Sequence, residues 1–322
     1  MATGKGEQES GGKPRIVHLD KVTMGGFEIP RPDTPHVWIE YDFTEPDAVV
    51  SRLAGADIAI INKVRLDAAT LAALPELKLI AVTATGTDVV DSVAAKAHGI
   101  EIRNVVGYAG TSVAEHVLML ILALARGLVP FRNAVIDGRW ENGRSFCVFA
   151  APVRDLAGQR LGLFGSGAIA QAVASRARAL GIEVVFARRQ GQPAAEGRVA
   201  FEEVLATSDI ISLHCPLTNE TRHMLDARTL ATMKPGAVII NTARGALIDL
   251  DALDKALESG QIGGAGIDVA PVEPPPPGSP ILQLARRDNV IVTPHSAWLS
   301  AQAVTEVARR TGQNVATFLA ER

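Results

Sequence analysis

Short apolar runs along the first third of the chain alternate with longer stretches whose apolar residues recur at helical spacing. The runs predict strands at 15–19, 57–61, 79–82 and 101–103. The longer stretches predict helices at 47–53, 67–74 and 89–98. Strands that alternate with helices form parallel sheets covered on both faces. This part is therefore predicted to be an α/β domain with a doubly wound parallel sheet.

A second alternation of the same kind follows a long helix predicted at about 112–127. Its strands are expected at 161–164, 183–186, 209–214, 237–241, 264–269 and 290–292, with helices at 249–259 and 301–319. The stretch 131–153 is irregular and contains Trp and Phe. Because loops of that length are uncommon in compact domains, we expect an extended arm used in assembly. Two α/β domains are therefore predicted.

The turn after the first strand of the second alternation carries a glycine fingerprint, GSGAIA at 165–170. Gly165 permits the tight turn, Gly167 lets the backbone approach a pyrophosphate, and Ala170 packs the helix against the strand. The N–H groups at the helix start then face the phosphates. The residues expected to contact this dinucleotide are Gly165, Ser166, Gly167, Ala168 and Ile169.

The end of the following strand selects between two dinucleotides. An NAD site places an acid about 20 residues beyond the fingerprint, on the ribose 2′-OH. Here the chain reads Ala187-Arg188-Arg189, with no acid between Glu183 and Glu196. Arg188 and Arg189 suit a 2′-phosphate, which favours NADP(H), with NAD(H) still possible. The alternative is that both are solvated surface charges.

Composition limits the kind of protein this is. The formal net charge of −3 over 322 residues argues against broad nucleic-acid binding. Two cysteines far apart indicate a reducing compartment, and we expect a cytoplasmic protein. The polar segment 1–13 is predicted to be a disordered leader, since it has no apolar core of a signal peptide. The apolar run 117–125 is too short to span a bilayer, so no membrane partner is expected.

Polar residues follow successive strands of the second alternation. His214-Cys215-Pro216 follows one strand and Asn241-Thr242-Ala243-Arg244-Gly245 the next; Asp268, with Glu273 shortly after, and Thr293-Pro294-His295 follow the last two. Ligands of open α/β sheets bind beyond the carboxyl ends of the strands. An Arg that pairs with a carboxylate, a His that gives a proton to a carbonyl oxygen and an acid that orients it suit hydride transfer to a 2-keto acid.

The remaining His and Cys residues give weaker signals. No His, Cys, Asp and Glu residues have the spacing of a metal site. His116, on the long helix, is interpreted as a packing or interface residue. Cys215 has no neighbour expected to lower the pKa of its thiol.

The ordered motifs GSGAIA, HCPLT, NTARG, GIDVAPVEP and TPHSAW resemble the D-isomer-specific 2-hydroxyacid dehydrogenases over nearly the whole chain. Within that family INKVRLD and ATGTD, with the EPP and TPHSAW segments, are most similar to glycerate dehydrogenases, also called hydroxypyruvate or glyoxylate reductases. The resemblance implies that Arg244, Glu273 and His295 are catalytic. It implies cofactor contacts from Thr111, Arg188, Arg189, His214, Cys215, Pro216, Thr221, Thr242, Ala243, Asp268 and Ala297 besides the fingerprint. It implies substrate contacts from Lys63, Thr85, Gly86, Arg244 and His295.

The resemblance also implies an architecture. A Rossmann coenzyme domain, 107–299, would be inserted in a flavodoxin-like substrate domain, 14–106 and 300–322, with a closing cleft between them. The chain would be a homodimer in which Phe146, Cys147 or Trp140 reaches the neighbour's pocket.

The expected reaction is NADP(H)-dependent interconversion of hydroxypyruvate or glyoxylate with D-glycerate or glycolate. The open alternatives are oxidation of 3-phosphoglycerate, for which Lys63 and Arg65 offer cations, and a nucleotide-sensing corepressor.

Overall fold

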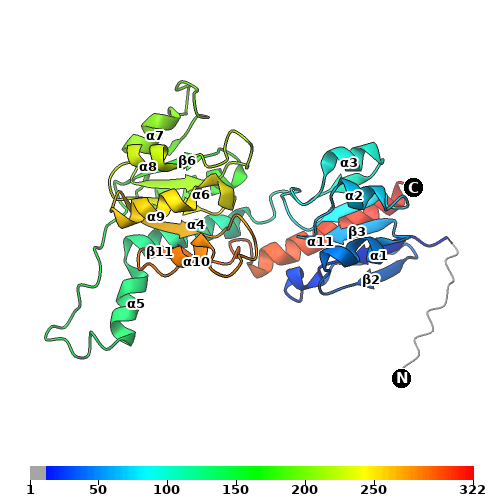
Figure 1. The fold of residues 1–322 in the computed structure, drawn as a ribbon, viewed down its shortest axis with the longest axis horizontal. Helices are drawn as coiled ribbons and strands as arrows, with labels where there is room; N and C mark the ends of the chain where they lie inside the picture. Colours follow the sequence, from blue (N-terminus) through cyan, green and yellow to red (C-terminus); the bar gives the residue numbers. More distant parts are fainter. Residues whose placement is uncertain (1–11) are drawn as a thin grey trace. The chain divides into compact units, whose positions relative to one another are not determined.

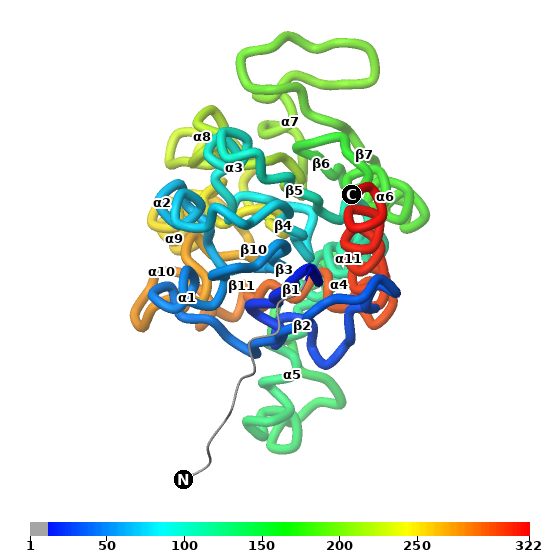
Figure 2. The backbone as a smooth tube through the Cα atoms, turned by 90° about the vertical axis from the view of Figure 1, so that its right-hand side faces the viewer, coloured from blue at the N-terminus to red at the C-terminus, as the bar shows by residue number. Residues whose placement is uncertain are grey.

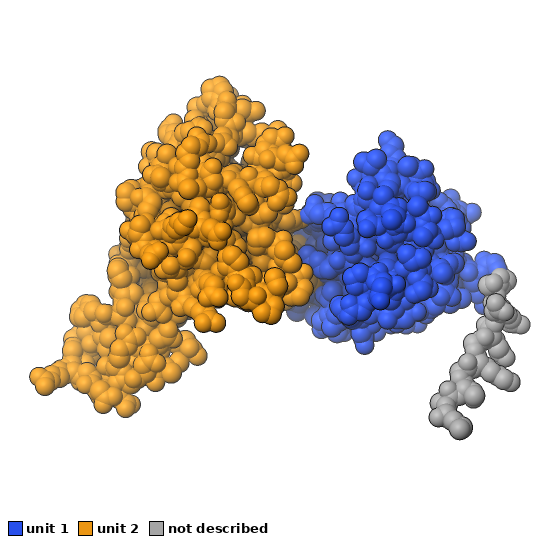
Figure 3. All heavy atoms as spheres, viewed as in Figure 1, with its two compact units in different colours: residues 1–108, 300–322 blue, residues 109–299 orange. Residues whose placement is uncertain are grey.

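The computed structural model describes residues 12–322, so the predicted leader lies outside the described residues except for its last two positions. The chain forms two compact units (Figure 3): Met1–Tyr108 with Ser300–Arg322, and Ala109–Leu299. Each unit is built on its own parallel sheet. This confirms the predicted class of two parallel-sheet α/β domains.

The first unit contains five parallel strands in the order β2-β1-β3-β4-β5, which is the flavodoxin-like order. The strands are β1 Arg15–His18, β2 Val37–Glu40, β3 Ile58–Ile61, β4 Leu79–Val82 and β5 Glu101–Arg103. The helices are η1 Lys21–Met24, η2 Pro46–Ala48, α1 Val49–Leu53, α2 Ala68–Ala72, α3 Ser92–Ala97 and α11 Ala301–Ala320. Figure 2 shows α11 on one side of this sheet and α1 and α2 on the other.

The second unit contains six parallel strands in the order β11-β10-β9-β8-β6-β7. The strands are β6 Arg160–Phe164, β7 Glu183–Phe186, β8 Ile210–Leu213, β9 Ala237–Asn241, β10 Ile262–Ile267 and β11 Val290–Val292. The helices are α4 Gly110–Ala125, α5 Leu128–Ile136, α6 Ala168–Ala179, α7 Phe201–Thr207, α8 Ala227–Thr232, η3 Gly245–Leu247, α9 Leu250–Glu258 and α10 Pro280–Leu284. Helices α4 and α6 pack together, and α8 packs between α7 and α9.

The prediction that 131–153 is irregular throughout is wrong, because its first residues belong to α5. Gly127 adopts the left-handed conformation with φ 61°, which ends α4 and lets a second helix start in a new direction, with Pro130 in its first turn. Figure 1 shows α5 and the loop after it reaching away from the sheet of their own unit. Within residues 12–322 no single helix is long and apolar enough to cross a membrane, and α4 with α5 meets that test only as a pair bent by 60°.

Candidate active site

The parallel strands of the second unit bring all their carboxyl ends to one edge of the sheet. The chain leaves β6 for β7 on one side and then returns to β8 on the other, so the strand order reverses between β6 and β8. Open α/β sheets bind their ligands at such a reversal. The fingerprint turn follows β6 directly, and most of the other residues predicted in this unit follow β7 to β11.

The fingerprint turn has the geometry that its glycines predict. Gly165 has φ 122°, and a Cβ there would lie 2.5 Å from the His214 carbonyl oxygen. A Cβ on Gly167 would meet no protein atom within 4 Å, so the space beside it is open. Within residues 12–322 no side chain caps the start of α6, where Ala168 is exposed, whereas Ala170 is fully buried. An open glycine beside uncapped N–H groups fits a pyrophosphate.

Three arginines surround the end of β7. Arg188 is half-buried, and its Nε has no hydrogen-bond partner among the described residues, while Arg189 is exposed. The chain returns to pair Ala187 with Val199, which brings Arg198 back to the turn. Arg198 Nη2 donates to Ser166 Oγ at 2.8 Å. Arg198 was not among the predicted residues, because its approach depends on the course of a loop.

The loop after β8 is held mainly by its own contacts. Desolvation lowers the pKa of His214 to about 4, and its Nε2 lies 2.9 Å from Ser212 Oγ. Burial raises the pKa of the Cys215 thiol to about 11, which is the opposite direction from that of an activated thiol. Thr221 Oγ1 donates to the carbonyl of Pro216 at 2.8 Å and so closes the loop.

The loop after β9 presents Arg244. Asn241 stabilises this loop: its Nδ2 donates to the Arg244 carbonyl at 2.9 Å, and its Oδ1 accepts the Ala243 N–H at 3.0 Å. A Cβ on Gly245 would lie 2.1 Å from the carbonyl carbon of Ala270, so glycine allows this loop to touch the loop after β10. Thr242 Oγ1 is buried and has no hydrogen-bond partner in the described part of the chain.

The loops after β10 and β11 bring Glu273 and His295 into direct contact. Glu273 Oε2 lies 2.6 Å from His295 Nδ1, and Glu273 Oε1 accepts the N–H of Ala270 at 2.8 Å. The side chain of Glu273 is 30 % exposed and that of His295 is 29 % exposed. His295 has φ 53°, a conformation that non-glycine residues rarely adopt. A carboxylate on Nδ1 leaves Nε2 as the nitrogen that can exchange a proton with a ligand.

Asp268 lies fully buried behind this pair. Its Oδ1 accepts the Thr293 hydroxyl at 2.5 Å and the Ser296 N–H at 2.9 Å, and its Oδ2 accepts the Ala297 N–H at 3.0 Å. His116 of α4 lies 2.9 Å from Thr293 Oγ1. The interpretation of His116 as a packing or interface residue therefore misses a specific hydrogen bond, because the local pattern of α4 does not reveal which loop lies beside it.

The predicted substrate residues of the first unit follow neighbouring strands. Lys63 follows β3, in a loop whose N–H groups at 62, 63 and 64 all donate to the carboxylate of Asp20, at 2.7 to 3.3 Å. Thr85 and Gly86 follow β4; Thr85 Oγ1 donates to Val105 O at 3.0 Å, and Asn104 Nδ2 donates to Thr85 O at 2.6 Å. Thr111, a predicted cofactor contact, is exposed in the first turn of α4.

The sequence model of the NAD-binding domain of D-isomer specific 2-hydroxyacid dehydrogenases matches residues 118–297, which hold the fingerprint and the three predicted catalytic residues. The chain belongs to this family. It is 47 % identical to a glycerate dehydrogenase of Methylorubrum extorquens over 307 residues, 95 % of this chain and 96 % of that one. It is 34 % identical to a hydroxypyruvate reductase of Blautia hydrogenotrophica over 288 residues, 87 % of this chain and 88 % of that one.

Solved structures share the fold. The TT0316 protein of Thermus thermophilus matches with a TM-score of 0.81 at 34 % identity, over 96 % of this chain and 97 % of that one. A D-lactate dehydrogenase of Aquifex aeolicus, solved with NAD and lactic acid, matches with a TM-score of 0.79 at 27 % identity, over 95 % and 96 %. The family's cofactor is a nicotinamide dinucleotide and its substrates are small 2-hydroxy acids.

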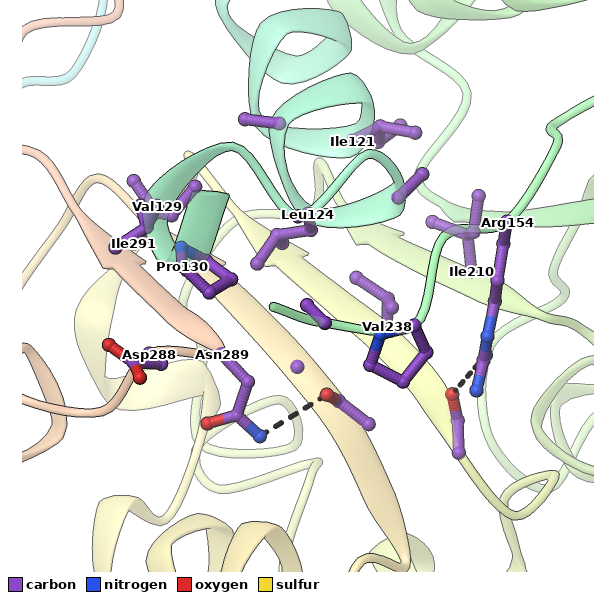
Figure 4. A pocket seen from close by; sticks show the side chains of 18 of the residues that line it. Ile121, Leu124, Val129, Pro130, Arg154, Ile210, Val238, Asp288, Asn289 and Ile291 are labelled. Atoms are coloured by element: carbon purple, nitrogen blue, oxygen red, sulfur yellow. Dashed lines mark hydrogen bonds between the residues drawn. The ribbon is translucent and has the colours of Figure 1, made fainter. Parts of the chain in front are cut away.

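One cavity of this dehydrogenase, of about 130 Å³, lies at the opposite edge of the sheet (Figure 4). It lies among Leu124, Pro130, Val238 and Ile291, near the starts of the strands. Arg154 and Asn289 at its rim donate to backbone carbonyls. The predicted catalytic residues take no part in it. The cavity and the predicted site therefore lie at opposite edges of the sheet.

Proposed function

We propose that the chain uses NADP(H) to interconvert hydroxypyruvate or glyoxylate with D-glycerate or glycolate. The main support is the 2.6 Å hydrogen bond between His295 and Glu273, together with the close approach of the Glu273 loop to the Arg244 loop at Gly245 and Ala270. In the proposal His295 and Glu273 form an acid/base pair, and Arg244, on the same sheet as the dinucleotide fingerprint, binds the substrate carboxylate. The similarity to a glycerate dehydrogenase and a hydroxypyruvate reductase supports the substrate class.

In this proposal each side chain has a definite part in the reduction. The nicotinamide, when bound, supplies the hydride that reaches the carbonyl carbon. His295 gives the proton on Nε2 to the carbonyl oxygen, so the two-electron reduction is balanced. Glu273, on Nδ1, stabilises the imidazolium and fixes its orientation. Arg244 pairs with the substrate carboxylate. In the oxidation each transfer is reversed.

Catalytic variants test these parts. His295→Ala should lower kcat by about 100- to 10,000-fold through loss of the proton donor. Arg244→Ala should lower turnover far more than dinucleotide affinity, and Arg244→Lys should recover little because it lacks the planar fork. Dinucleotide binding measured by fluorescence is the control for folding. An unchanged rate for His295→Ala, or an equal loss of rate and dinucleotide affinity for Arg244→Ala, would contradict the assignment.

The preference for NADP(H) is supported by the cations near the end of β7. Arg188 has a buried Nε without a partner in residues 12–322, Arg189 is exposed, and Arg198 lies against Ser166 of the fingerprint. No carboxylate stands at position 187, where Ala187 is buried. A guanidinium pairs with a phosphate through two parallel hydrogen bonds. The buried Thr242 hydroxyl, which has no hydrogen-bond partner in residues 12–322, supports a nicotinamide contact in the same site, together with Ala243, Asp268 and Ala297.

Steady-state kinetics with NADPH and NADH against hydroxypyruvate, glyoxylate and pyruvate test the cofactor and the substrate together. We expect higher kcat/KM with NADPH, and in Arg188→Ala/Arg189→Ala a preference shifted toward NADH. A higher kcat/KM with NADH in the unaltered enzyme would overturn the cofactor assignment. Failure to reduce any of the three acids would favour 3-phosphoglycerate oxidation or a dinucleotide-sensing binding protein.

The first unit is proposed to supply the substrate-binding backbone. Lys63, Thr85 and Gly86 follow adjacent parallel strands, and Asp20 orders the loop of Lys63. Lys63→Ala should raise the KM for hydroxypyruvate without changing the KM for NADPH. Equal effects on both would contradict a substrate role.

A homodimer is also proposed. The segment α5 with the following loop exposes large apolar side chains, including Ile136 at 62 %, Trp140 at 52 %, Phe146 at 91 % and Phe149 at 93 %. Such side chains on one projecting segment suit a self-complementary interface. Sedimentation should give a dimer, and Phe146→Ser/Phe149→Ser should shift it toward the monomer. A monomeric unaltered chain would refute the proposal.

A cytoplasmic location completes the proposal. Cys147 and Cys215 are both free thiols. Unpaired cysteines are typical of reducing compartments. Cell fractionation followed by immunoblotting checks this assignment.

A further inference from the structure

Helix α4 contacts the loop that follows β11 through two residues one turn apart. Ser112 Oγ donates to the Ala297 carbonyl at 2.7 Å, and His116 Nε2 lies 2.9 Å from Thr293 Oγ1. Residues four apart project from the same face of a helix. The His116 side chain is 13 % exposed, and the Asp268 side chain beside it is 0 % exposed. This face of α4 therefore borders the loop on both sides of His295.

The direction of the His116 hydrogen bond follows from the neighbouring groups. The Thr293 hydroxyl has one hydrogen, which it donates in a hydrogen bond of 2.5 Å to Asp268 Oδ1. Thr293 Oγ1 can then only accept from His116, so His116 Nε2 carries a hydrogen. Burial lowers the pKa of His116, against the opposite effect of Asp268. His116 is therefore neutral at neutral pH, with its single proton on Nε2.

We propose that His116 is a positioning residue for His295. His116 donates to Thr293, and Thr293 donates to the carboxylate of Asp268. The same carboxylate accepts the N–H of Ser296, and the backbone carbonyl of Asp268 accepts the N–H of His295. His295 itself has φ 53°, and a non-glycine residue keeps such a backbone conformation only where the surrounding structure imposes it. The inference rests on the proposed function insofar as His295 is the acid/base.

The two histidines contact different carboxylates. His116 Nε2 lies 3.5 Å from Asp268 Oδ1, and His295 Nδ1 lies 2.6 Å from Glu273 Oε2. Loss of the donor at His116 would loosen the loop and weaken the contact between His295 and Glu273. A merely structural His116 would change the unfolding temperature but not this contact.

Two pairs of variants separate these roles. His116→Leu and Thr293→Val remove the donor or its acceptor; His116→Gln and Thr293→Ser retain hydrogen-bonding groups. We expect the first pair to lose about 10- to 100-fold in kcat/KM for hydroxypyruvate through misplacement of the proton donor. The KM for NADPH should change little. The second pair should recover most of the rate. Glu115→Gln, an exposed neighbour on α4, is the control and should leave the rate unchanged.

The decisive readout is the hydrogen bond between His295 and Glu273, followed by NMR of the Nδ1 proton of His295 in the ligand-free protein and assigned with His295→Ala. In His116→Leu and Thr293→Val this signal should move upfield or disappear, because the hydrogen bond to Glu273 weakens. An unchanged signal and an unchanged kcat/KM in folded variants would overturn the inference. If the signal changes but the unaltered chain reduces no 2-keto acid, the positioning stands and the proposed function fails.

Discussion

Two glycines in one turn have opposite requirements at the residue scale. Gly165 is needed by the protein itself, since φ is 122° and a Cβ would lie 2.5 Å from the His214 carbonyl oxygen. Gly167 has open space around it. We predict that Gly165→Ala lowers the unfolding temperature, whereas Gly167→Ala keeps it and weakens dinucleotide binding by at least about tenfold, because the methyl group occupies the phosphate's approach. Thermal unfolding and NADPH fluorescence titration check both; a destabilised Gly167→Ala would contradict the prediction.

His214 makes stability depend on pH. Desolvation lowers its pKa to about 4 in the folded protein, against an ordinary value of 6.5. Below pH 6.5 the unfolded chain binds a proton that the folded chain does not bind. The free energy of unfolding should therefore fall as pH drops from 6.5 to 4, by about 1–3 kcal/mol from this residue.

Urea denaturation at several pH values between 7 and 4 measures this dependence. His214→Gln, which keeps a polar group near Ser212, should show a shallower decline than the unaltered chain. Parallel declines in the two proteins would show that His214 does not cause the effect.

At the scale of elements, the loop after β3 depends on a single carboxylate. Asp20 is 3 % exposed and accepts the backbone N–H groups of residues 62 to 64. Asp20→Ala would leave these donors without their acceptor, and we predict a loss of about 1–3 kcal/mol in the free energy of unfolding. Asp20→Asn, which keeps one acceptor oxygen, should lose less. Chemical denaturation checks the order; equal losses would contradict it.

Elements whose two faces are both buried could be predicted from the sequence almost to the residue. The apolar runs of the inner strands β4 and β9 coincide with the observed strands. The edge strand β7 is partly exposed, but its run Val184–Phe186 was also recognised. Strand β2 was missed because it lies in a stretch rich in proline and acidic residues, 30–47, which gives no clear strand pattern. The start of α5 was missed because its helical pattern follows directly on α4.

The candidate site shows the same division. Residues that directly follow strands were predictable, because parallel strands bring their ends to one edge. The bond between His116 and Thr293 joins positions 177 apart in sequence. Arg198 meets Ser166 across 32 positions through a loop without regular structure. Neither local periodicity nor strand order specifies such contacts.

At the scale of the whole molecule, the two units differ in continuity. Ala109–Leu299 is one uninterrupted segment, whereas the other unit takes its last helix, α11, from the end of the chain. The α11 side chains of Val307 and Val315 are fully buried, and α11 packs on β4.

We predict that residues 109–299 alone fold cooperatively. Residues 12–108 alone should not, because they lack α11 to cover one face of their sheet. Joining 300–322 to residue 108 through a short glycine-serine linker should restore folding. Circular dichroism melts of the three fragments check this. A cooperative melt of 12–108 alone would refute it.

The late position of α11 also has a consequence for synthesis. A ribosome delivers five strands of the first unit early and the helix that covers them much later, after the whole second unit has emerged. Until α11 has emerged, the apolar face of β4 lacks its cover and is open to chaperones or to aggregation. A premature stop before or within α11 would therefore damage the part of the protein that was made first.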